Sequence, residues 1–342
     1  MKKLLNTLYI STQEAYLHKD GETIVVEIED AKKFFPIHTI GSIVCFGNIR
    51  VSPFLMGFCA ERGVAISFLT EHGKFLASVR GTVNGNVLLR REQYRMADNE
   101  EHSRNITANI VRGKLFNSRV VLNRVLRDHE SKINAEAIRQ TTDRFDSYIK
   151  KIARANNLDE IRGFEGIAAA EYFDVFDNLI LEQKEDFKFT VRSRRPPLDE
   201  INAMLSFAYT ILSHDIRSAL ESVGLDSQIG FLHRDRSGRH SLALDLMEEF
   251  RPVIADRLVL SLINRKQVNK KDFEKSAGGA VTMRNDARKT FLAEWQNRKK
   301  EEVFHPYIEE KVQIGLLFFV QANLLARFIR GDIDGYPPFF WR

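Results

Sequence analysis

The spacing of hydrophobic and polar positions changes once along the chain, near residue 90. Before that point, short apolar runs rich in Val, Ile, Phe and Tyr are typical of β-strands. The runs cover residues 5–11, 15–17, 23–27, 43–46, 64–69 and 75–79, and one short helix is expected at 53–62. The first part of the chain is therefore predicted to be a small β-sheet domain, residues 1–89.

After residue 90 the apolar positions recur every three to four residues, which is the period of an amphipathic helix. Helices are expected at residues 104–125, 133–154, 161–181, 198–223, 241–264, 284–298 and 307–329. A chain of 342 residues is also long for a single core. We therefore predict an α+β multidomain protein, in which a larger all-α-helical domain, residues 90–342, follows the β domain.

Composition narrows the function classes only slightly. The net charge is +5 and the isoelectric point is about 9.1, which permits nucleic-acid binding without requiring it. The two cysteines, Cys45 and Cys59, form no CxxC pair and exclude a zinc ribbon. Residues 314–329 are apolar but contain Gln321 and Arg327, so we expect a buried helix and no membrane span. A cytoplasmic protein is the resulting expectation.

Acidic residues gather on one predicted helix, at residues 241–250. On that helix Asp245 and Glu248 lie three positions apart, opposite the apolar face, and Glu249 lies beside them. Two carboxylates on one helix face repel each other unless a cation or solvent screens them. Such oxygen ligands suit Mg²⁺ or Mn²⁺. The alternative is a solvated acidic helix face, which a bare DxxE pattern favours.

Two further sites carry candidate chemistry. His233 stands between an apolar run and a polar turn, close in sequence to the acidic helix, while His214 is a competing histidine within a predicted helix. Glu165 lies between Gly163 and Gly166, and such small residues allow a ligand backbone or another helix to approach closely. Close helix packing alone would also explain the two glycines.

Two basic segments could hold a phosphate backbone. Clustered arginines and lysines bind phosphates and release counterions. The candidates are Lys188, Arg192, Arg194 and Arg195 in one segment, and Arg284, Arg288 and Lys289 in the other. Solvated helix faces explain either segment equally well. The chain has no GxxxxGK[ST] phosphate-binding loop, so nothing in the sequence indicates nucleotide hydrolysis.

Several motifs, taken in order, make a more specific pattern. GFEGIAAAEYF, PPLDEINAMLSFAY and GFLHRDRSGRHSLALDLMEEFRP resemble the CRISPR-associated spacer-acquisition endonuclease/integrase family. The resemblance continues through AVTMRNDARKTFL and RGDIDGYPPFFW, so it covers nearly the whole chain. The C-terminal phrases look closest to the subtype I-C branch of that family.

The resemblance implies a divalent-metal-dependent DNA endonuclease and integrase, which inserts foreign-DNA fragments into a CRISPR array as new spacers. Its metal ligands would be Glu165, His233 and Glu248, which would hold Mg²⁺ or Mn²⁺. Asp245 would belong to the same catalytic group. Glu249 is the nearest rival to Glu248, because it is equally acidic and one residue further on. The helical domain would then be the catalytic one.

The resemblance also implies partners. It implies a homodimer to which the β domains contribute, a complex with the small CRISPR-associated adaptation partner, and DNA substrates, namely protospacer fragments and the CRISPR leader–repeat. Two other functions stay open. One is a structure-specific nuclease for branched DNA in repair, which the reaction products would distinguish. The other is a non-catalytic DNA-binding scaffold, which metal binding would distinguish.

Overall fold

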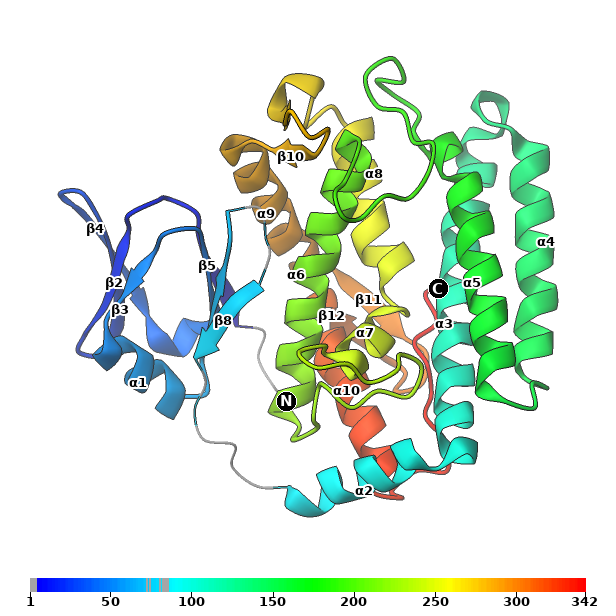
Figure 1. Ribbon diagram of the computed structural model, residues 1–342, viewed down its shortest axis with the longest axis horizontal. Coiled ribbons are helices and arrows are strands. Elements are labelled where there is room, and N and C mark those ends of the chain that lie inside the picture. The colour runs from blue at the N-terminus through cyan, green and yellow to red at the C-terminus, as the bar shows by residue number, and fades with distance from the viewer. Residues whose placement is uncertain (1–4, 72, 74, 80, 82–85) are drawn as a thin grey trace. The chain divides into compact units, whose positions relative to one another are not determined.

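The computed structural model describes residues 5–71, 73, 75–79, 81 and 86–342, and it confirms the expected α+β class. A β-sheet region comes first and a mostly helical region follows it (Figure 1). The chain divides into two compact units. The first contains residues 1–84 and 283–300, and the second contains residues 85–282 and 301–342. Residues 1–4, 72, 74, 80 and 82–85, some of which fall in the predicted strand and turn regions, lie outside the described part.

The first unit contains two four-stranded sheets. In one sheet the order is β1-β5-β7-β8, where β1, β5 and β7 run parallel and β8 is antiparallel to β7. In the other the order is β4-β3-β2-β6. The strands are β1 (Asn6–Ile10), β2 (Tyr16–Asp20), β3 (Thr23–Ile28), β4 (Ala31–Pro36), β5 (Ile40–Phe46), β6 (Arg50–Val51), β7 (Ala65–Leu69) and β8 (Phe75–Val79).

The predicted strands of this unit and its short helix are present. Helix α1 (Pro53–Glu61) begins where the Ser52 side chain accepts a hydrogen bond from the Leu55 backbone N–H, a cap that a helix start favours. Apolar residues of the strands and of α1 form a core that includes Leu17, Ile43 and the two cysteines. The sequence pattern missed β4 and β6, because β4 is largely exposed and β6 has only two residues.

Helix α9 (Asn285–Lys300) belongs to this first unit, although it follows most of the helical half in the sequence. Its Gln296 side chain donates a hydrogen bond of 2.6 Å to the Thr7 carbonyl on β1. Its Arg288 side chain donates to the Glu71 carbonyl. The first unit is therefore built from two stretches of chain that lie about 200 residues apart.

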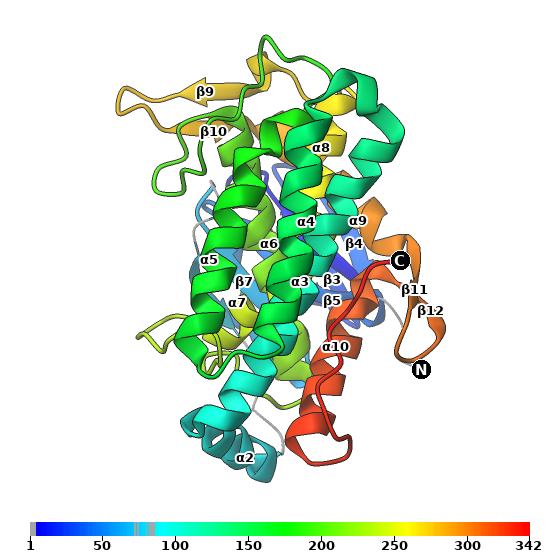
Figure 2. The ribbon, with the colours of Figure 1, turned by 90° about the vertical axis from the view of Figure 1, so that its right-hand side faces the viewer.

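The second unit is mainly helical. Its helices are α2 (Val87–Asp98), α3 (Glu100–His129), α4 (Ala135–Ile152), α5 (Leu158–Asp174), α6 (Glu200–Ser222), α7 (Ser241–Met247), α8 (Arg257–Asn264) and α10 (Ile314–Ile329). The 30-residue α3 packs along α4 and α5, and the three lie side by side in both views (Figures 1 and 2). Helix α6 packs against α7 and α10.

Three details of this unit correct the sequence predictions. The helix predicted at residues 241–264 is broken into α7, a π-helix (Arg251–Asp256) and α8. The last helix begins at Ile314, because the preceding residues form the hairpin of β11 (Glu302–His305) and β12 (Glu310–Gln313). A second hairpin, β9 (Phe273–Lys275) with β10 (Val281–Met283), was also missed.

The predicted apolar helix near the C-terminal end is α10, and most of its large side chains are buried. Among the residues that the structure describes, no helix combines the length and apolar character that crossing a membrane requires.

Candidate active site

The predicted carboxylates Glu165 and Glu248 share one cation, the ammonium group of Lys114. Lys114 lies on α3, and its Nζ donates a hydrogen bond to Glu165 Oε1 on α5. The same Nζ lies 2.8 Å from Glu248 Oε2, directly after α7. Three segments that are distant in the sequence therefore bring two acids and a lysine together in the second unit.

Glu248 is buried, which rules out the alternative interpretation of a solvated acidic helix face. Burial alone would raise the pKa of its carboxyl group, but the positive charges of Arg251, Lys114 and His233 together lower that pKa below its ordinary value. Arg251 Nη1 lies 2.8 Å from Glu248 Oε1. Because both Glu248 oxygens face cations, the carboxylate stays ionised inside the protein.

Lys114 is held charged by the same arrangement. Burial alone would lower the pKa of its ammonium group, but the charges of Glu248 and Glu165 raise that pKa above its ordinary value. A buried charge without such partners would be strongly destabilising. Lys114 thus depends on the two acids to remain charged inside the protein.

Asp245 lies fully buried under the loop that carries His233. Its two oxygens accept hydrogen bonds from the backbone N–H groups of Phe231, Leu232 and His233, at 2.6, 3.0 and 2.9 Å. Asp245 Oδ1 also lies 2.7 Å from His233 Nδ1. Gly230 makes this possible, because a Cβ there would lie 2.8 Å from Asp245 Oδ2.

The hydrogen bond that His233 Nδ1–H donates to Asp245 sets the direction of the histidine ring. It occupies Nδ1 and leaves Nε2 available for another partner, an arrangement that commonly orients a metal-binding histidine. Asp245 itself has no oxygen left over. It therefore acts on the imidazole of His233, while Glu165 and Glu248 remain the acids that face the shared cation.

The donor set can be tested against a divalent ion. Across the described residues, no three His, Cys, Asp or Glu side chains converge closely enough to hold one. The Lys114 ammonium instead stands between the two acids. A position that already attracts a cation between carboxylates, next to an imidazole, matches the oxygen and nitrogen donors that Mg²⁺ and Mn²⁺ accept. The chemistry of these residues therefore fits such an ion, while in this structure the Lys114 ammonium lies between the two acids.

Glu249, the rival of Glu248, faces another environment. Its carboxylate accepts hydrogen bonds from the Tyr336 hydroxyl at 2.6 Å, from Gln321 Nε2 at 2.9 Å and from the Phe339 backbone N–H at 2.8 Å. Burial raises the pKa of Glu249 to about 8, although these hydrogen bonds lower it. The structure thus directs Glu249 toward the C-terminal segment and Glu248 toward Lys114.

The space beside Glu165 is open. A Cβ placed at Gly163 or at Gly166 would meet no atom within 4 Å. The two glycines therefore do not serve close packing against another helix, which was one of the two interpretations of the sequence. They leave the helix backbone next to Glu165 accessible to a ligand.

The predicted DNA-binding residues fall into different environments. The Arg192 guanidinium is hydrogen-bonded within the protein, because it donates to Asn202 Oδ1 at 2.6 Å and to Ser206 Oγ at 3.2 Å. In the same unit Lys188, Arg194 and Arg195 are exposed. In the first unit Arg288 is buried and bonded to Glu71, whereas Arg284 and Lys289 are exposed. His214, the other candidate histidine, lies on α6.

Sequence reasoning missed Lys114, Arg251 and Gly230. A signal existed only for Lys114, which interrupts the buried face of α3. The burial of Asp245 and Glu248 excludes a solvated acidic helix face. With Glu165, the oriented histidine and the two cations, these acids form the candidate active site.

Comparison with known proteins identifies the kind of enzyme. The family model for "CRISPR associated protein Cas1" matches residues 8–297. The CRISPR-associated endonuclease Cas1 1 of Chlorobaculum tepidum is 54% identical over 343 residues, covering all of both chains. A solved Cas1 structure from Thermotoga maritima has a TM-score of 0.81 at 25% identity and covers 95% of this chain and 97% of that one.

A chain of a Cas6-RT-Cas1–Cas2 complex shares the fold, with a TM-score of 0.82 at 22% identity. The match covers all of this chain and 36% of that one. The protein belongs to the Cas1 family of CRISPR-associated endonucleases, the integrases of spacer acquisition. The predicted family and enzyme class are thereby confirmed.

Proposed function

We propose that Glu165, His233 and Glu248 bind Mg²⁺ or Mn²⁺ and that this centre cuts and joins DNA phosphodiesters. The observation that carries the proposal is the Lys114 ammonium shared by two acids from different segments. When bound, such an ion polarises a phosphate and lowers the pKa of a water or a 3′-hydroxyl nucleophile. Attack by water gives cleavage, and attack by a 3′-hydroxyl gives integration.

The protein's own residues supply the remaining functions. Asp245 holds the His233 ring with Nε2 free, so we propose it as a positioning residue. Arg251 keeps Glu248 ionised. The open backbone at Gly163 and Gly166 gives the DNA a path to Glu165.

Calorimetric titration with Mn²⁺ tests this site. Wild-type protein should bind one ion per chain at this centre. Glu165→Gln and Glu248→Gln should each abolish that binding while keeping the helical circular dichroism of the wild type. Full DNA cleavage in excess EDTA would show that the chemistry does not need the ion.

Lys114 offers a second, independent test. An ammonium that occupies the space between the acids should compete with a divalent ion. Lys114→Met should therefore be less stable without metal, because it leaves two acids facing each other, and should gain more in Tm from added Mn²⁺ than wild type does. Lys150→Met, at an exposed position on α4, serves as the control. An unchanged Mn²⁺-induced shift in Lys114→Met would argue against competition.

We further propose that DNA contacts Lys188, Arg194 and Arg195 of the second unit and, separately, the exposed Arg284 and Lys289 of the first unit. Removing one phosphate-binding side chain should reduce the slope of log affinity against log salt by about 0.9 on duplex DNA. The double variant Arg194→Ala/Arg195→Ala should lower that slope. Arg192→Ala should instead destabilise the fold and leave the slope unchanged, because its guanidinium bonds internally. An unchanged slope in the double variant would remove these two residues from the DNA interface.

We propose a homodimer formed through the first unit, where Phe34 and Phe54 are 58% and 80% exposed. The family resemblance implies the dimer, and these exposed aromatics are the side chains of the first unit that we propose for its contact. Phe54→Asp should shift the mass measured by light scattering from dimer to monomer. A wild-type protein that stays monomeric at micromolar concentration would contradict the dimer.

The proposed cellular setting follows the family. We propose cytoplasmic complexes with the small CRISPR-associated adaptation partner and with protospacer and leader–repeat DNA; the matched Cas6-RT-Cas1 chain forms a complex with Cas2. The motif RGDIDGYPPFFW near the C-terminal end supports assignment to the subtype I-C branch. The substrate preference distinguishes an integrase from a repair nuclease. It is measured by integration and cleavage assays on leader–repeat and branched DNA, with and without the partner. A preference for branched DNA would indicate a repair nuclease.

A further inference from the structure

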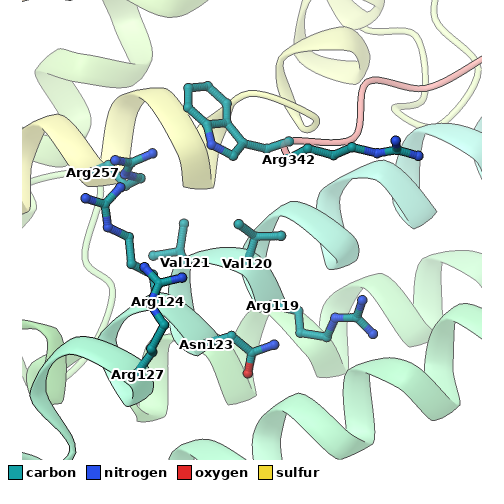
Figure 3. A pocket seen from close by; sticks show the side chains of 9 residues that line it. Arg119, Val120, Val121, Asn123, Arg124, Arg127, Arg257 and Arg342 are labelled. Atoms are coloured by element: carbon teal, nitrogen blue, oxygen red, sulfur yellow. The ribbon is translucent and has the colours of Figure 1, made fainter. Parts of the chain in front are cut away.

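A basic pocket lies in the second unit, beside the C-terminal half of α3. Its volume is about 440 Å³, within the range typical of small-ligand sites. Arg124, Arg127 and Arg257 line it, together with Val120, Val121 and Trp341. Figure 3 shows the three arginines on one side of the space and the two valines beside them.

The charged side chains that line this pocket are all arginines. Arg124 and Arg127 share one acid, Asp128, at 3.6 and 2.8 Å. Both arginines are more than half exposed, so these pairs are weak and easily exchanged for a ligand. Arg119 and Arg342 also line the pocket, although Arg119 is paired with Asp146. Planar guanidinium groups bind phosphate oxygens in pairs, so a phosphate is the anion that fits here.

The pocket also has an aromatic wall that the fold holds in place. The Trp341 backbone N–H donates to Asn117 Oδ1 at 2.8 Å, and Asn117 Nδ2 donates to the Phe339 carbonyl at 2.9 Å. The Arg257 guanidinium lies 5.3 Å from the centre of the Trp341 ring. An indole fixed next to arginines and aliphatic side chains suits a planar base that is attached to a phosphate.

This pocket is separate from the catalytic centre. Arg124 is ten residues after Lys114 on α3, about 15 Å along the helix axis, and it points in a different direction. A ligand held by Arg124 and Arg257 would therefore leave the Glu165–Lys114–Glu248 group untouched.

We infer that this pocket is a nucleotide-binding site, which takes one nucleoside phosphate with the phosphate on Arg124, Arg127 and Arg257 and the base against Trp341 and the valines. The same chemistry is offered by a free nucleotide and by a nucleotide within a single DNA strand. The inference does not depend on the proposed metal site.

Isothermal titration in EDTA tests the pocket with four probes: dTMP, inorganic phosphate, thymidine and a five-nucleotide thymidine oligomer. We expect dTMP to bind more tightly than phosphate and thymidine to bind weakest. Arg124→Ala/Arg257→Ala should weaken dTMP binding at least tenfold. Trp341→Leu should weaken dTMP binding by about five- to hundredfold, the range for a stacked base, and should leave phosphate binding unchanged.

Two controls make the result specific. Arg95→Ala removes an exposed, acid-paired arginine on α2, and it should leave dTMP binding unchanged. Glu165→Gln, which lowers metal binding under the proposed function, should also leave dTMP binding unchanged. An oligomer that binds far more tightly than dTMP and competes with it identifies a DNA strand as the source, while equal affinities identify a free nucleotide. Equal binding of dTMP and phosphate, or no dTMP binding, would overturn the inference.

Discussion

Glu248 and Glu249 are neighbours in the chain with the same side chain, and both are buried. Their electrostatic surroundings are nevertheless opposite. Glu248 faces the cations of Lys114 and Arg251. Glu249 faces neutral donors, the Tyr336 hydroxyl among them. The pKa of the first is lowered and that of the second is raised to about 8.

The difference shows how one helix end can serve two purposes. A carboxylate surrounded by cationic side chains remains charged, and a divalent metal ion can replace those side chains as its partner. A carboxyl group surrounded by hydrogen-bond donors fixes a chain segment in place, and two of the three donors to Glu249, the Tyr336 hydroxyl and the Phe339 N–H, belong to the C-terminal segment. Glu249 thereby anchors the C-terminal segment directly behind Glu248.

The largest expected effect separates the two glutamates by activity. Glu248→Gln should reduce DNA cleavage by more than the ~10–100-fold that loss of a supporting group behind a metal ligand causes. Glu249→Gln should leave cleavage close to wild type, because its carboxylate faces away from Lys114. Cleavage rates at saturating Mn²⁺ measure both. The reverse pattern would transfer the catalytic assignment to Glu249.

Another buried acid, Asp256, extends the comparison to the effect of pH on stability. Burial raises the pKa of Asp256 to about 6 from an ordinary 3.8, although the Tyr209 hydroxyl and the Arg251 guanidinium lower it. The folded protein then holds this proton more tightly than the unfolded chain, so stability should fall as pH rises from about 4 to 6. The decrease corresponds to about 3 kcal/mol.

Asp256→Asn should remove this pH-dependent decrease. The variant should be more stable than wild type at pH 7 and no more stable at pH 4. Thermal unfolding of both proteins across that range measures the effect. Parallel profiles of Tm against pH would show that Asp256 does not titrate in this window.

Tyr336→Phe tests the anchoring role of Glu249. The variant removes the donor 2.6 Å from the buried carboxylate, so the free energy of unfolding should drop by about 1–3 kcal/mol. Mn²⁺ affinity should not change. Tyr307→Phe, at a half-exposed position, is the matched control for denaturation. A large drop in Mn²⁺ affinity in Tyr336→Phe would mean that the two glutamates are not independent.

The smallest expected effect concerns the open side of Glu165. Gly166→Ala should stabilise α5 by about 0.5–1 kcal/mol, because its Cβ meets nothing within 4 Å. DNA affinity should fall while Mn²⁺ affinity stays constant, since the methyl group narrows the proposed DNA path. Fluorescence anisotropy with labelled DNA measures this. Unchanged DNA affinity would place the path elsewhere.

The sequence predicted the order of the two regions and most of the longer elements. The spacing of apolar residues within one element can be recognised without knowing which element packs against it. It missed the hairpin β11–β12 and the break after α7, since hairpin pairing and π-helical turns depend on tertiary contacts. Local patterns singled out Glu165, His233 and Glu248 as candidates, but only the family resemblance made them metal ligands. Periodicity alone placed Glu248 opposite the apolar face of its helix, although the side chain is buried.

The remaining site residues could not be predicted from a pattern. Lys114 is 51 positions from Glu165 and 134 from Glu248, so only the packing of α3 brings them together. Gly230 gives no signal of its own, because its role is to leave room for Asp245. Neighbouring acids such as Glu248 and Glu249 differ only in what surrounds them.

The first unit is completed late during synthesis, because one of its helices follows most of the second unit in the sequence. The first unit contains residues 1–84 but also needs α9, which ends at residue 300. At ribosomal rates of about 5–20 residues per second, the N-terminal strands wait on the order of 10–40 s for the helix that completes them. During that interval Thr7 on β1 lacks the hydrogen bonds that Gln296 and Lys299 supply. A nascent chain therefore exposes part of this surface to chaperones, and a gene fragment cut after residue 84 encodes an incomplete domain.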